Sequence, residues 1–432
     1  MIAEKFDVIV VGAGLAGTAA AYTLAKAGAK VALLERGDYP GSKNVMGGIL
    51  YRQPMEKIIP GWWRDAPVER PISEQRVWVL TEDSAVTMGY KSQRFNEEPY
   101  NAFTVLRARF DKWFADQAVA AGAVLVTEVV AEDVLRDNGQ VVGVRTNRPE
   151  GDLRANVVIA ADGVNSLLSQ RVGLHGEWPP DRVAIGVKEI IQLSRSVLED
   201  RFGLENGEGT AIELFGDATH GLMGYGFIYT NRDTLSVGVG VLLSQMIERK
   251  LNPNQLLEDF KRHPMVRRLL EGGEAKEYMA HLIPEGGWTE VPPLYTGGYL
   301  VVGDAAMMVN GLFREGSNFA AISGKLAAQT ALEALDRGDF SKRTMVGYVE
   351  RLQESFIVKD LEGYSRVSRY AHEHPDLFTV YPQMMAEAVH QLMTVDSTPK
   401  RMKLLDVFKH ARQRRPLLAL AKDMAGALRA LP

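Results

Sequence analysis

An apolar run followed by three closely spaced glycines opens the chain and limits what it can fold into. Residues 6–11 read FDVIVV, which predicts a strand buried on both faces. Gly12, Gly14 and Gly17 then follow the spacing G-x-G-x-x-G, and good helix formers occupy residues 18–27. At this spacing the first glycine permits a tight turn, the second lets a pyrophosphate approach the backbone, and the third lets the helix pack against the strand. The stretch therefore predicts the start of a dinucleotide-binding βαβ unit.

The second strand of that unit, residues 30–35, ends in an acid. Glu35 lies eighteen residues after Gly17, where a carboxylate can accept hydrogen bonds from the ribose hydroxyls of an adenine dinucleotide. The phosphates are expected on the unpaired N–H groups at the start of the helix. Because two strands, a helix and an acid accompany the glycines, dinucleotide binding is favoured over a glycine-rich structural turn.

Composition narrows the range of functions. The formal net charge of −4 argues against a general nucleic-acid binder. The sequence contains no run of eighteen uncharged apolar residues and does not open on a basic segment with an apolar stretch behind it. We therefore expect neither a membrane-spanning helix nor a signal peptide. The chain has no cysteine, so any cysteine-ligated iron–sulfur cluster must come from a partner.

Further stretches fit the same domain. A glycine-rich loop over residues 37–48 favours a cofactor-lining role over a plain surface loop. Residues 49–102 are expected to be irregular, with one strand over 76–80. A helix is predicted from Thr104 to about 121, strands over 124–130 and 154–163, and a hairpin between them. The second of these strands ends in Asp162-Gly163, and a later one, from residue 298, ends in Gly303-Asp304.

The middle of the chain has a different pattern. Strand-like runs separated by turns between residues 179 and 293 predict an antiparallel sheet, interrupted by one helix over 253–270. Tyr225, Phe227 and Tyr229 alternate along one run and would share one face of the sheet. These three aromatic side chains have two interpretations: ordinary packing on the sheet, or contact with an apolar, planar ligand. After a glycine loop at 311–318 and a helix over 319–335, the last ninety residues read as amphipathic helices with basic flanks over 342–364, 381–393, 400–415 and 417–431. They could form a cap on the core, a membrane-surface element or a partner-docking element.

The order of these motifs resembles the FAD-binding fold shared by glutathione-reductase-like flavoproteins, aromatic hydroxylases and geranylgeranyl reductases. Two loops, residues 40–51 and 311–320, are similar to those of the electron-transfer flavoprotein:quinone oxidoreductase family, and most closely to its FixC-type branch. The resemblance covers essentially the whole chain. It implies an α/β FAD-binding fold with an antiparallel β-sheet substrate domain and a helical C-terminal region. It also implies non-covalently bound FAD as the cofactor, with the protein binding and orienting it and no catalytic side chain or metal.

The resemblance and the motifs together predict the site residues. Quinone is expected to enter between the sheet domain and the flavin, near Tyr225, Phe227 and Tyr229. The residues predicted to bind the cofactor are Gly12, Ala13, Gly14, Leu15, Ala16, Gly17, Glu35, Arg36, Asn44, Met46, Gly47, Gly48, Arg107, Val130, Asp162, Gly163, Gly303, Asp304, Gly311, Gly316 and Asn318.

The resemblance also implies partners and a domain plan. The partners are the alpha and beta subunits of an electron-transfer flavoprotein, a small ferredoxin-like iron–sulfur subunit, a quinone and the inner face of the cytoplasmic membrane. The predicted domains are an FAD domain (1–75, 103–178 and 294–340), a quinone domain (76–102 and 179–293) and a helical region (341–432). The function implied by the resemblance is that of an FAD-dependent oxidoreductase that passes electrons from an electron-transfer flavoprotein to a membrane quinone within a multi-subunit complex. The alternatives to this function are a geranylgeranyl-reductase-like or hydroxylase-like flavoenzyme, and a flavin scaffold subunit without turnover.

Overall fold

The structure is a computed structural model that describes residues 5–44 and 48–431. The chain divides into two compact units, each built from three separate segments. The first unit contains the residues up to Glu69, Asn101–Arg182 and Leu282–Tyr364, and the second contains Arg70–Tyr100, Val183–His281 and the residues from Ser365 onward. The three-domain division expected from the sequence stays a prediction.

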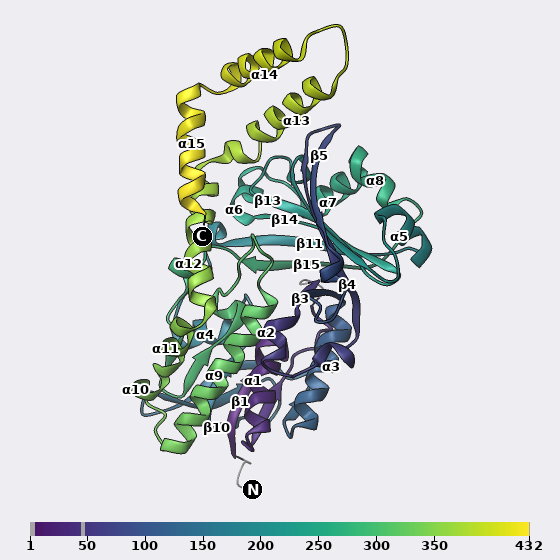
Figure 1. Cartoon of the computed structure of the whole chain (residues 1–432). Helices are drawn as coiled ribbons and strands as arrows, with labels where there is room; N and C mark the ends of the chain where they lie inside the picture. Colours follow the sequence, from purple (N-terminus) through teal and green to yellow (C-terminus); the bar gives the residue numbers. More distant parts are fainter. Residues whose placement is uncertain (1–4, 45–47, 432) are drawn as a thin grey trace. The chain divides into compact units, whose positions relative to one another are not determined.

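A mostly parallel sheet forms the centre of the first unit (Figure 1). Its strands run in the order β16-β17-β10-β1-β2-β7, and neighbouring strands from β17 to β7 are parallel. The central strands are buried along almost their whole length, as expected for a sheet covered on both faces. The strands are β1 (Lys5–Val11), β2 (Val31–Leu34), β7 (Val124–Val126), β10 (Leu153–Ala160), β16 (Tyr295–Thr296) and β17 (Tyr299–Val301), with the hairpin β8 (Ala131–Asp137) and β9 (Gln140–Thr146) added beside β10.

Two long helices of this unit pack against each other with almost no space between their backbones. These are α1 (Leu15–Lys26) and α9 (Ser317–Arg337), which lie side by side in Figure 1. A Cβ atom at Gly324 would lie 2.0 Å from the carbonyl oxygen of Ala16. Only glycine therefore permits this contact, which fixes the start of α1 beside α9. The other elements of the unit are β3 (Ile49–Tyr51), α2 (Arg52–Glu56), β6 (Ala102–Val105), α3 (Arg107–Ala120), α4 (Leu167–Val172), α10 (Lys342–Met345) and α11 (Gly347–Glu354).

The second unit is built on a sheet with helices over one face. Ile212, Ile228 and Val237 point into a core that Leu257 and Phe260 fill from the helices. The sheet runs in the order β15-β11-β14-β13-β12-β4, with β5 beside β4, and all of these pairs for which a register is defined are antiparallel except β12 with β4. The strands are β4 (Val68–Leu80), β5 (Ala85–Lys91), β11 (Val183–Gln192), β12 (Gly209–Gly216), β13 (Gly224–Thr230), β14 (Thr234–Leu242) and β15 (Glu274–Pro284), and the helices are α5 (Arg195–Phe202), α6 (Leu243–Glu248), α7 (Pro253–Arg262) and α8 (Pro264–Leu270).

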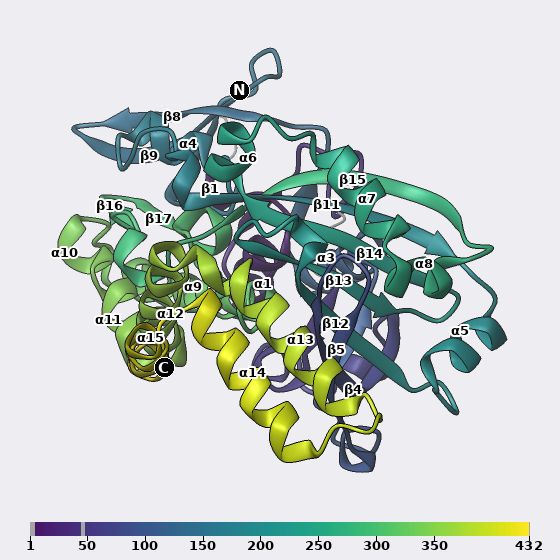
Figure 2. The same ribbon diagram turned by 90° about the horizontal axis from the view of Figure 1, so that it is seen from above.

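Helices complete the chain. α12 (Phe356–Glu373) begins in the first unit and ends in the second, and α13 (Val380–Met393) and α14 (Lys400–Arg414) then lie side by side (Figure 2) before α15 (Leu417–Ala430). Within the described part of the chain, no helix is both long enough and apolar enough to cross a membrane.

Several expectations about elements are wrong. The helix expected from Thr104 begins at Arg107, because Thr104 belongs to β6 and pairs with β3. Residues 49–102, expected to be irregular, are largely regular. They include β4, which runs over thirteen residues and pairs with β12 only from Ile72, after Pro71. The helix expected over 253–270 is two helices, because Pro264 cannot donate the next helical hydrogen bond. The helix expected over 342–364 is broken at Val346, between α10 and α11, and again at Ser355, whose Oγ accepts the N–H of Ile357 and starts α12.

Candidate functional site

Four neighbouring parallel strands end at the same edge of the first unit's sheet, and each is followed by a predicted site residue. Gly12 follows β1, Glu35 follows β2, Asp162 lies two residues beyond β10, and Gly303 lies two residues beyond β17. Ligands of open α/β sheets bind outside the carboxyl ends of the strands. The fold therefore brings together motifs that are almost 300 residues apart in the sequence.

The glycine turn between β1 and α1 has the geometry that its spacing predicts. Gly12 has φ +101°, and a Cβ atom there would lie 2.2 Å from the carbonyl oxygen of Ala161. A Cβ atom at Gly17 would lie 1.8 Å from the carbonyl oxygen of Gly12. Around the Cβ position of Gly14, in contrast, nothing lies within 4 Å. Two glycines therefore hold the turn closed and the third leaves open space beside the first turn of α1, which begins at Leu15 rather than Thr18.

Glu35 connects the glycine turn to the loop that follows β2. Its Oε2 accepts the N–H of Ala13 at 3.0 Å, and its Oε1 accepts the N–H of Gly37 at 2.7 Å. Each carboxylate oxygen keeps a second lone pair for a ribose hydroxyl. Nearby, the N–H of Val129 donates to the carbonyl oxygen of Glu35. The N–H of the exposed Val130 donates to Asn147 Oδ1, and its carbonyl oxygen accepts the N–H of Asn147.

Only one of the two carboxylate oxygens of Asp162 accepts a hydrogen bond from the described residues. Its Oδ2 accepts the N–H of Leu168 at 3.0 Å, whereas its Oδ1 is buried and accepts no hydrogen bond from any described residue. Burial raises the pKa of Asp162 to about 6, although backbone N–H groups and the charge of the exposed Arg36 act in the opposite direction. Gly163 next to it has φ +73° and nothing near its Cβ position.

The Gly303-Asp304 turn packs directly on the first turn of α1. Gly303 has φ +64°, and a Cβ atom there would lie 2.9 Å from the Cβ of Ala16. Its N–H donates to Ser323 Oγ on α9 at 3.0 Å. The half-buried Asp304 follows in the same short turn.

The loop that leads into α9 carries a second buried, unsatisfied oxygen. The backbones of Asn310 and Glu315 exchange two hydrogen bonds that close the loop between Gly311 and Gly316. Asn318 is 1% exposed and donates through Nδ2 to Glu315 Oε1 at 3.2 Å. Its Oδ1 has no hydrogen-bond partner among the described residues.

The predicted arginine forms a buried ion pair. Arg107 Nε lies 2.7 Å from Asp111 Oδ1, and its second contact, Nη2 to Oδ2, is 2.8 Å. Burial raises the pKa of Asp111, while Arg107 and a hydrogen bond from Asn44 oppose this shift. Gly41 packs closely on the start of α3, because a Cβ atom there would lie 2.8 Å from the carbonyl oxygen of Arg107. Arg107 thus anchors the loop that follows β2. Of the other predicted loop residues, Gly48 is buried, and Met46 and Gly47 lie outside the described residues.

The edge of this sheet is suited to a dinucleotide. It offers open space at Gly14, free N–H groups at the start of α1, and acceptor oxygens on Asp162 and Asn318 that need donors. It holds no metal-ligand cluster: no group of three or more histidines or acids in residues 5–44 and 48–431 is arranged to bind a metal ion.

Known proteins resemble the chain along its whole length. A family model for the ETF-QO/FixC family C-terminal domain matches residues 367–431, and one for an FAD dependent oxidoreductase matches residues 7–171. Protein FixC of Bradyrhizobium diazoefficiens is 47% identical over 93% of both chains, and Protein FixC of Azotobacter vinelandii is 45% identical over 98% of both. The chain belongs to the ETF-QO/FixC family. Another relative, 40% identical over 97% of both chains, is the probable electron transfer flavoprotein-quinone oxidoreductase YdiS of Escherichia coli.

Solved structures of other flavoenzymes share the family fold. A geranylgeranyl bacteriochlorophyll reductase-like protein from Thermoplasma acidophilum superposes with a TM-score of 0.74 at 22% identity, over 96% of this chain and 97% of its own. A flavin-dependent brominase superposes with a TM-score of 0.66 at 18% identity, over 95% of this chain and all of its own. The fold predicted from the sequence is confirmed, and FAD is the cofactor. As in its family, the chain is an FAD-dependent oxidoreductase, while the individual cofactor residues stay predictions.

The predicted substrate residues lie on β13 of the second unit. Phe227 and Tyr229 are buried and stack with ring centroids 5.0 Å apart, and Tyr225 contacts Phe215 at 5.7 Å. Their neighbours on the strand, such as Ile228, point into the helix-covered core. The three aromatic rings therefore share the opposite face of the sheet, and their role in substrate binding stays a prediction.

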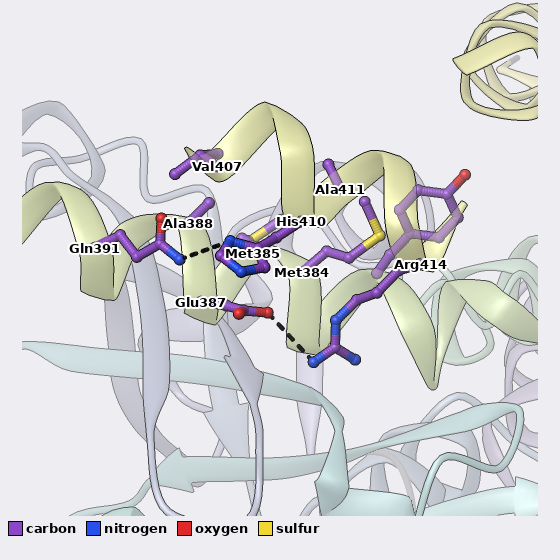
Figure 3. Close-up of a pocket in the computed structure, with 10 residues that line it drawn as sticks. Met384, Met385, Glu387, Ala388, Gln391, Val407, His410, Ala411 and Arg414 are labelled. Carbon is purple, nitrogen blue, oxygen red and sulfur yellow. Dashed lines mark hydrogen bonds and ion pairs between the residues drawn. The ribbon is translucent and has the colours of Figure 1, made fainter. Parts of the chain in front are cut away.

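A cavity of about 330 Å³ separates α13 and α14 in the second unit. Figure 3 shows that Met384, Met385 and Val407 contribute to its lining, which is mainly apolar. Polar contacts between the helices border the cavity, among them Gln391 to His410 at 3.2 Å and Glu387 to Arg414 at 3.2 Å. The C-terminal helices thus join through a loosely filled apolar seam.

Sequence reasoning missed one polar pair near the predicted loop. Glu285 accepts a hydrogen bond from Tyr364, and both lie beside Gly311. The only local signal was an acid between a proline and two glycines at the end of the sheet domain. The partner on α12 could not be identified without the fold.

Proposed function

We propose that the chain passes electrons from an electron-transfer flavoprotein to a quinone, as one subunit of an electron-bifurcating complex. The observation that carries this proposal is similarity over 97% of the chain to a relative named as a probable electron transfer flavoprotein-quinone oxidoreductase. In this proposal the partners are the alpha and beta subunits of the electron-transfer flavoprotein and a small ferredoxin-like subunit. The absence of cysteine supports the last of these, because a cysteine-ligated cluster must then belong to another chain.

The chain's own residues bind and orient the cofactor in this reaction. When bound, FAD supplies the one- and two-electron chemistry. The glycine turn and the start of α1 hold the phosphates, Glu35 holds the ribose, and Asp162 and Asn318 accept hydrogen bonds that the protein leaves unmade. Arg107 and Asp111 fix the loop beside the cofactor.

We place the quinone against Tyr225, Phe227 and Tyr229. A stacked pair of buried rings offers a flat, apolar wall with few polar groups, which suits a planar ring.

The experiment follows oxidation of the reduced flavin by a soluble, short-chain quinone. The full chain with bound FAD is reduced under anaerobic conditions and mixed with the quinone in a stopped-flow instrument. We expect quinone to reoxidise the flavin, and separate alanine substitutions at the three aromatic positions to weaken the quinone dependence. Tyr90→Ala, which removes a 60% exposed ring of the same unit, is the control. A reduced flavin that is no faster to reoxidise with quinone than without it contradicts the proposed function.

The complex is also proposed to work at the inner face of the cytoplasmic membrane, where long-chain quinones reside. The support comes from the C-terminal helices. Phe408 and Leu418 are 62% and 85% exposed, and basic residues such as Lys409 and Arg412 flank them. Exposed apolar side chains among lysines and arginines suit an anionic lipid interface.

A further inference from the structure

A lysine lies on the same face of the second unit's sheet as the three predicted substrate residues. Lys188 on β11 pairs with Gly238 on β14, and Gly238 pairs in turn with Phe227 on β13. Residues that pair directly across neighbouring strands share one face of a sheet. The next residue of β11, Glu189, points to the other face, because its carboxylate accepts a hydrogen bond from Lys261 of α7 at 2.8 Å. Lys188 therefore shares the face of Phe227, opposite the helix-covered core.

Two buried charged side chains flank Phe227 in this row. Lys188 is 1% exposed, which is rare for a lysine. Glu213 on β12, which is 8% exposed, pairs with Phe227 from the other side. A buried ammonium group requires hydrogen-bond acceptors. Because it has three N–H donors, Lys188 can keep protein partners and still donate to a polar ligand.

Glycine leaves open space beside Lys188 on this face. In the next row along the strands, Gly240 of β14 pairs with Tyr225. Nothing lies within 4 Å of the Cβ position of Gly240, whereas a Cβ atom at Gly238 would lie 2.4 Å from Cζ of Phe227. The ring of Phe227 thus covers Gly238, and the space over Gly240 stays open. Rows on one face are about 7 Å apart and neighbouring strands about 4.8 Å, so the long side chain of Lys188 can reach this space.

We propose that the Lys188 ammonium group binds a carbonyl oxygen of the quinone, with the quinone ring over Gly240 and against the aromatic residues of β13. This inference rests on the proposed function and on that placement of the quinone. A simple quinone has hydrogen-bond acceptors and no donors, so a site that orients it needs a donor beside its apolar wall.

Lys188 also favours the reduction itself. Conversion of the quinone to a hydroquinone takes two electrons, which come from the cofactor, and two protons, which come from solvent. Negative charge grows on the quinone oxygens as the electrons arrive, and a cation that is hydrogen-bonded to one of them stabilises this charge. Lys188 forms no covalent bond and keeps its protons throughout.

The test compares variants of the full, FAD-containing chain. Lys188→Met removes the ammonium group and keeps an unbranched side chain, while Lys188→Arg keeps a cationic donor. Gly240→Ala adds a methyl group to the open space and leaves Lys188 in place. Lys276→Met is the matched control, because Lys276 is an exposed lysine on β15 of the same sheet. FAD content, circular dichroism and thermal unfolding establish which variants are folded, and Gly240→Ala carries the test if Lys188→Met is not.

The first readout is the rate at which a short-chain quinone reoxidises the reduced flavin, measured over a range of quinone concentrations. Lys188→Met should lower the rate at limiting quinone by ~10–100-fold, the usual effect of losing a hydrogen bond from a charged group. Lys188→Arg should recover most of this loss. Gly240→Ala should raise the quinone concentration needed for half the maximal rate, and Lys276→Met should match the parent chain.

The second readout does not depend on turnover. The infrared carbonyl band of a ¹³C-labelled short-chain quinone, bound at saturating concentration to the oxidised protein, should lie at lower frequency in the parent chain and Lys188→Arg than in Lys188→Met. A hydrogen bond from a cation weakens the C=O bond, whereas a merely structural lysine would leave the band unchanged.

The outcomes separate this inference from the proposed function. If the parent chain reduces quinone, an unchanged band and an unchanged rate in Lys188→Met overturn this inference alone, even if that variant is less stable. Unchanged quinone dependence in Gly240→Ala also overturns it. If the parent chain reduces no quinone, the proposed function and this inference fail together.

Discussion

At the scale of single residues, Glu35 shows how one side chain serves both the fold and the cofactor. The sequence assigned it to a ribose, and the structure adds two hydrogen bonds, from the N–H groups of Ala13 and Gly37. These bonds join the glycine turn to the loop after β2. Position and residue type predicted the acid, but its backbone partners depend on how the two turns pack.

Glu35→Ala should weaken FAD binding by about 1–3 kcal/mol, because two backbone N–H groups and the ribose lose a charged acceptor. Glu35→Gln keeps a neutral acceptor and should have a smaller effect. Titration of the apoprotein with FAD, followed by quenching of flavin fluorescence, measures both. Alanine at the exposed Glu128 is the control. Equal affinity in the parent chain and Glu35→Ala would remove Glu35 from the binding site.

Asp162 leads to a prediction about pH and stability. Burial raises its pKa from 3.8 to about 6 in the folded apoprotein. As the pH rises between these values, the unfolded chain releases the proton first, so the folded state holds more protons and the free energy of unfolding falls. Asp162→Asn should remove a decline on the order of 1–3 kcal/mol from this window. Urea unfolding of the apoprotein at several pH values measures the difference, with the exposed Asp116→Asn as control. Parallel pH curves for the parent chain and Asp162→Asn would contradict it.

At the scale of elements, the sequence predicted best where one local rule decides the structure. The glycine spacing identified the β1–α1 turn because Gly12 and Gly17 each answer a steric need of the turn. The first part of the long strand β4, before residue 76, was missed because its pairing with β12 is a tertiary choice that Pro71 conceals. The Glu285–Tyr364 pair was missed for the same reason, since no periodicity links a residue after β15 to one on α12.

Two glycines near α1 are expected to have different roles: Gly324 in the stability of the fold, and Gly14 in FAD binding. Gly324→Ala would place a Cβ atom 2.0 Å from the Ala16 oxygen and should destabilise the chain by about 1–3 kcal/mol. Gly14→Ala meets nothing within 4 Å and has φ −74°, so the apoprotein should keep its stability. It should lose FAD affinity, however, because the new methyl group fills the space intended for the phosphates.

Thermal unfolding of the apoprotein and FAD titration distinguish the two variants. A Gly14→Ala chain that binds FAD as tightly as the parent would mean that the pyrophosphate lies elsewhere. A Gly324→Ala chain of unchanged stability would mean that α9 can shift away from α1 at little cost.

At the scale of the whole molecule, the chain combines a cofactor unit with a second unit that ends in exposed amphipathic helices. The sequence left the role of these helices open among a cap, a membrane contact and a partner contact. In the structure Leu405, Phe408 and Leu418 are more than half exposed, so they are not cap residues within their own unit. The surface that covers these side chains belongs to a partner, either a membrane or another protein.

The membrane proposal predicts binding of the full chain to anionic liposomes. Replacing Leu405 and Phe408 together by Asp should reduce co-sedimentation, while Asp at Val395, which is 86% exposed in the loop before α14, should not. Added salt should weaken binding of the parent chain, because the Debye length shortens from ~8 Å at physiological ionic strength to ~3 Å at 1 M. Equal binding by the double variant would leave partner docking as the role of these helices.

The strand order of the first unit also determines when, during synthesis, this protein can complete its fold. During synthesis β1 emerges first, yet its neighbour β10 is made about 150 residues later, and α9, on which α1 packs, only after residue 316. At translation rates of about 5–20 residues per second, α1 waits roughly 15–60 s for that partner. Until β10 is made, the apolar β1 strand has an unpaired edge that other chains could join. The nascent chain therefore needs protection before it can hold its flavin, and loading of FAD becomes a late event that follows synthesis of three quarters of the protein.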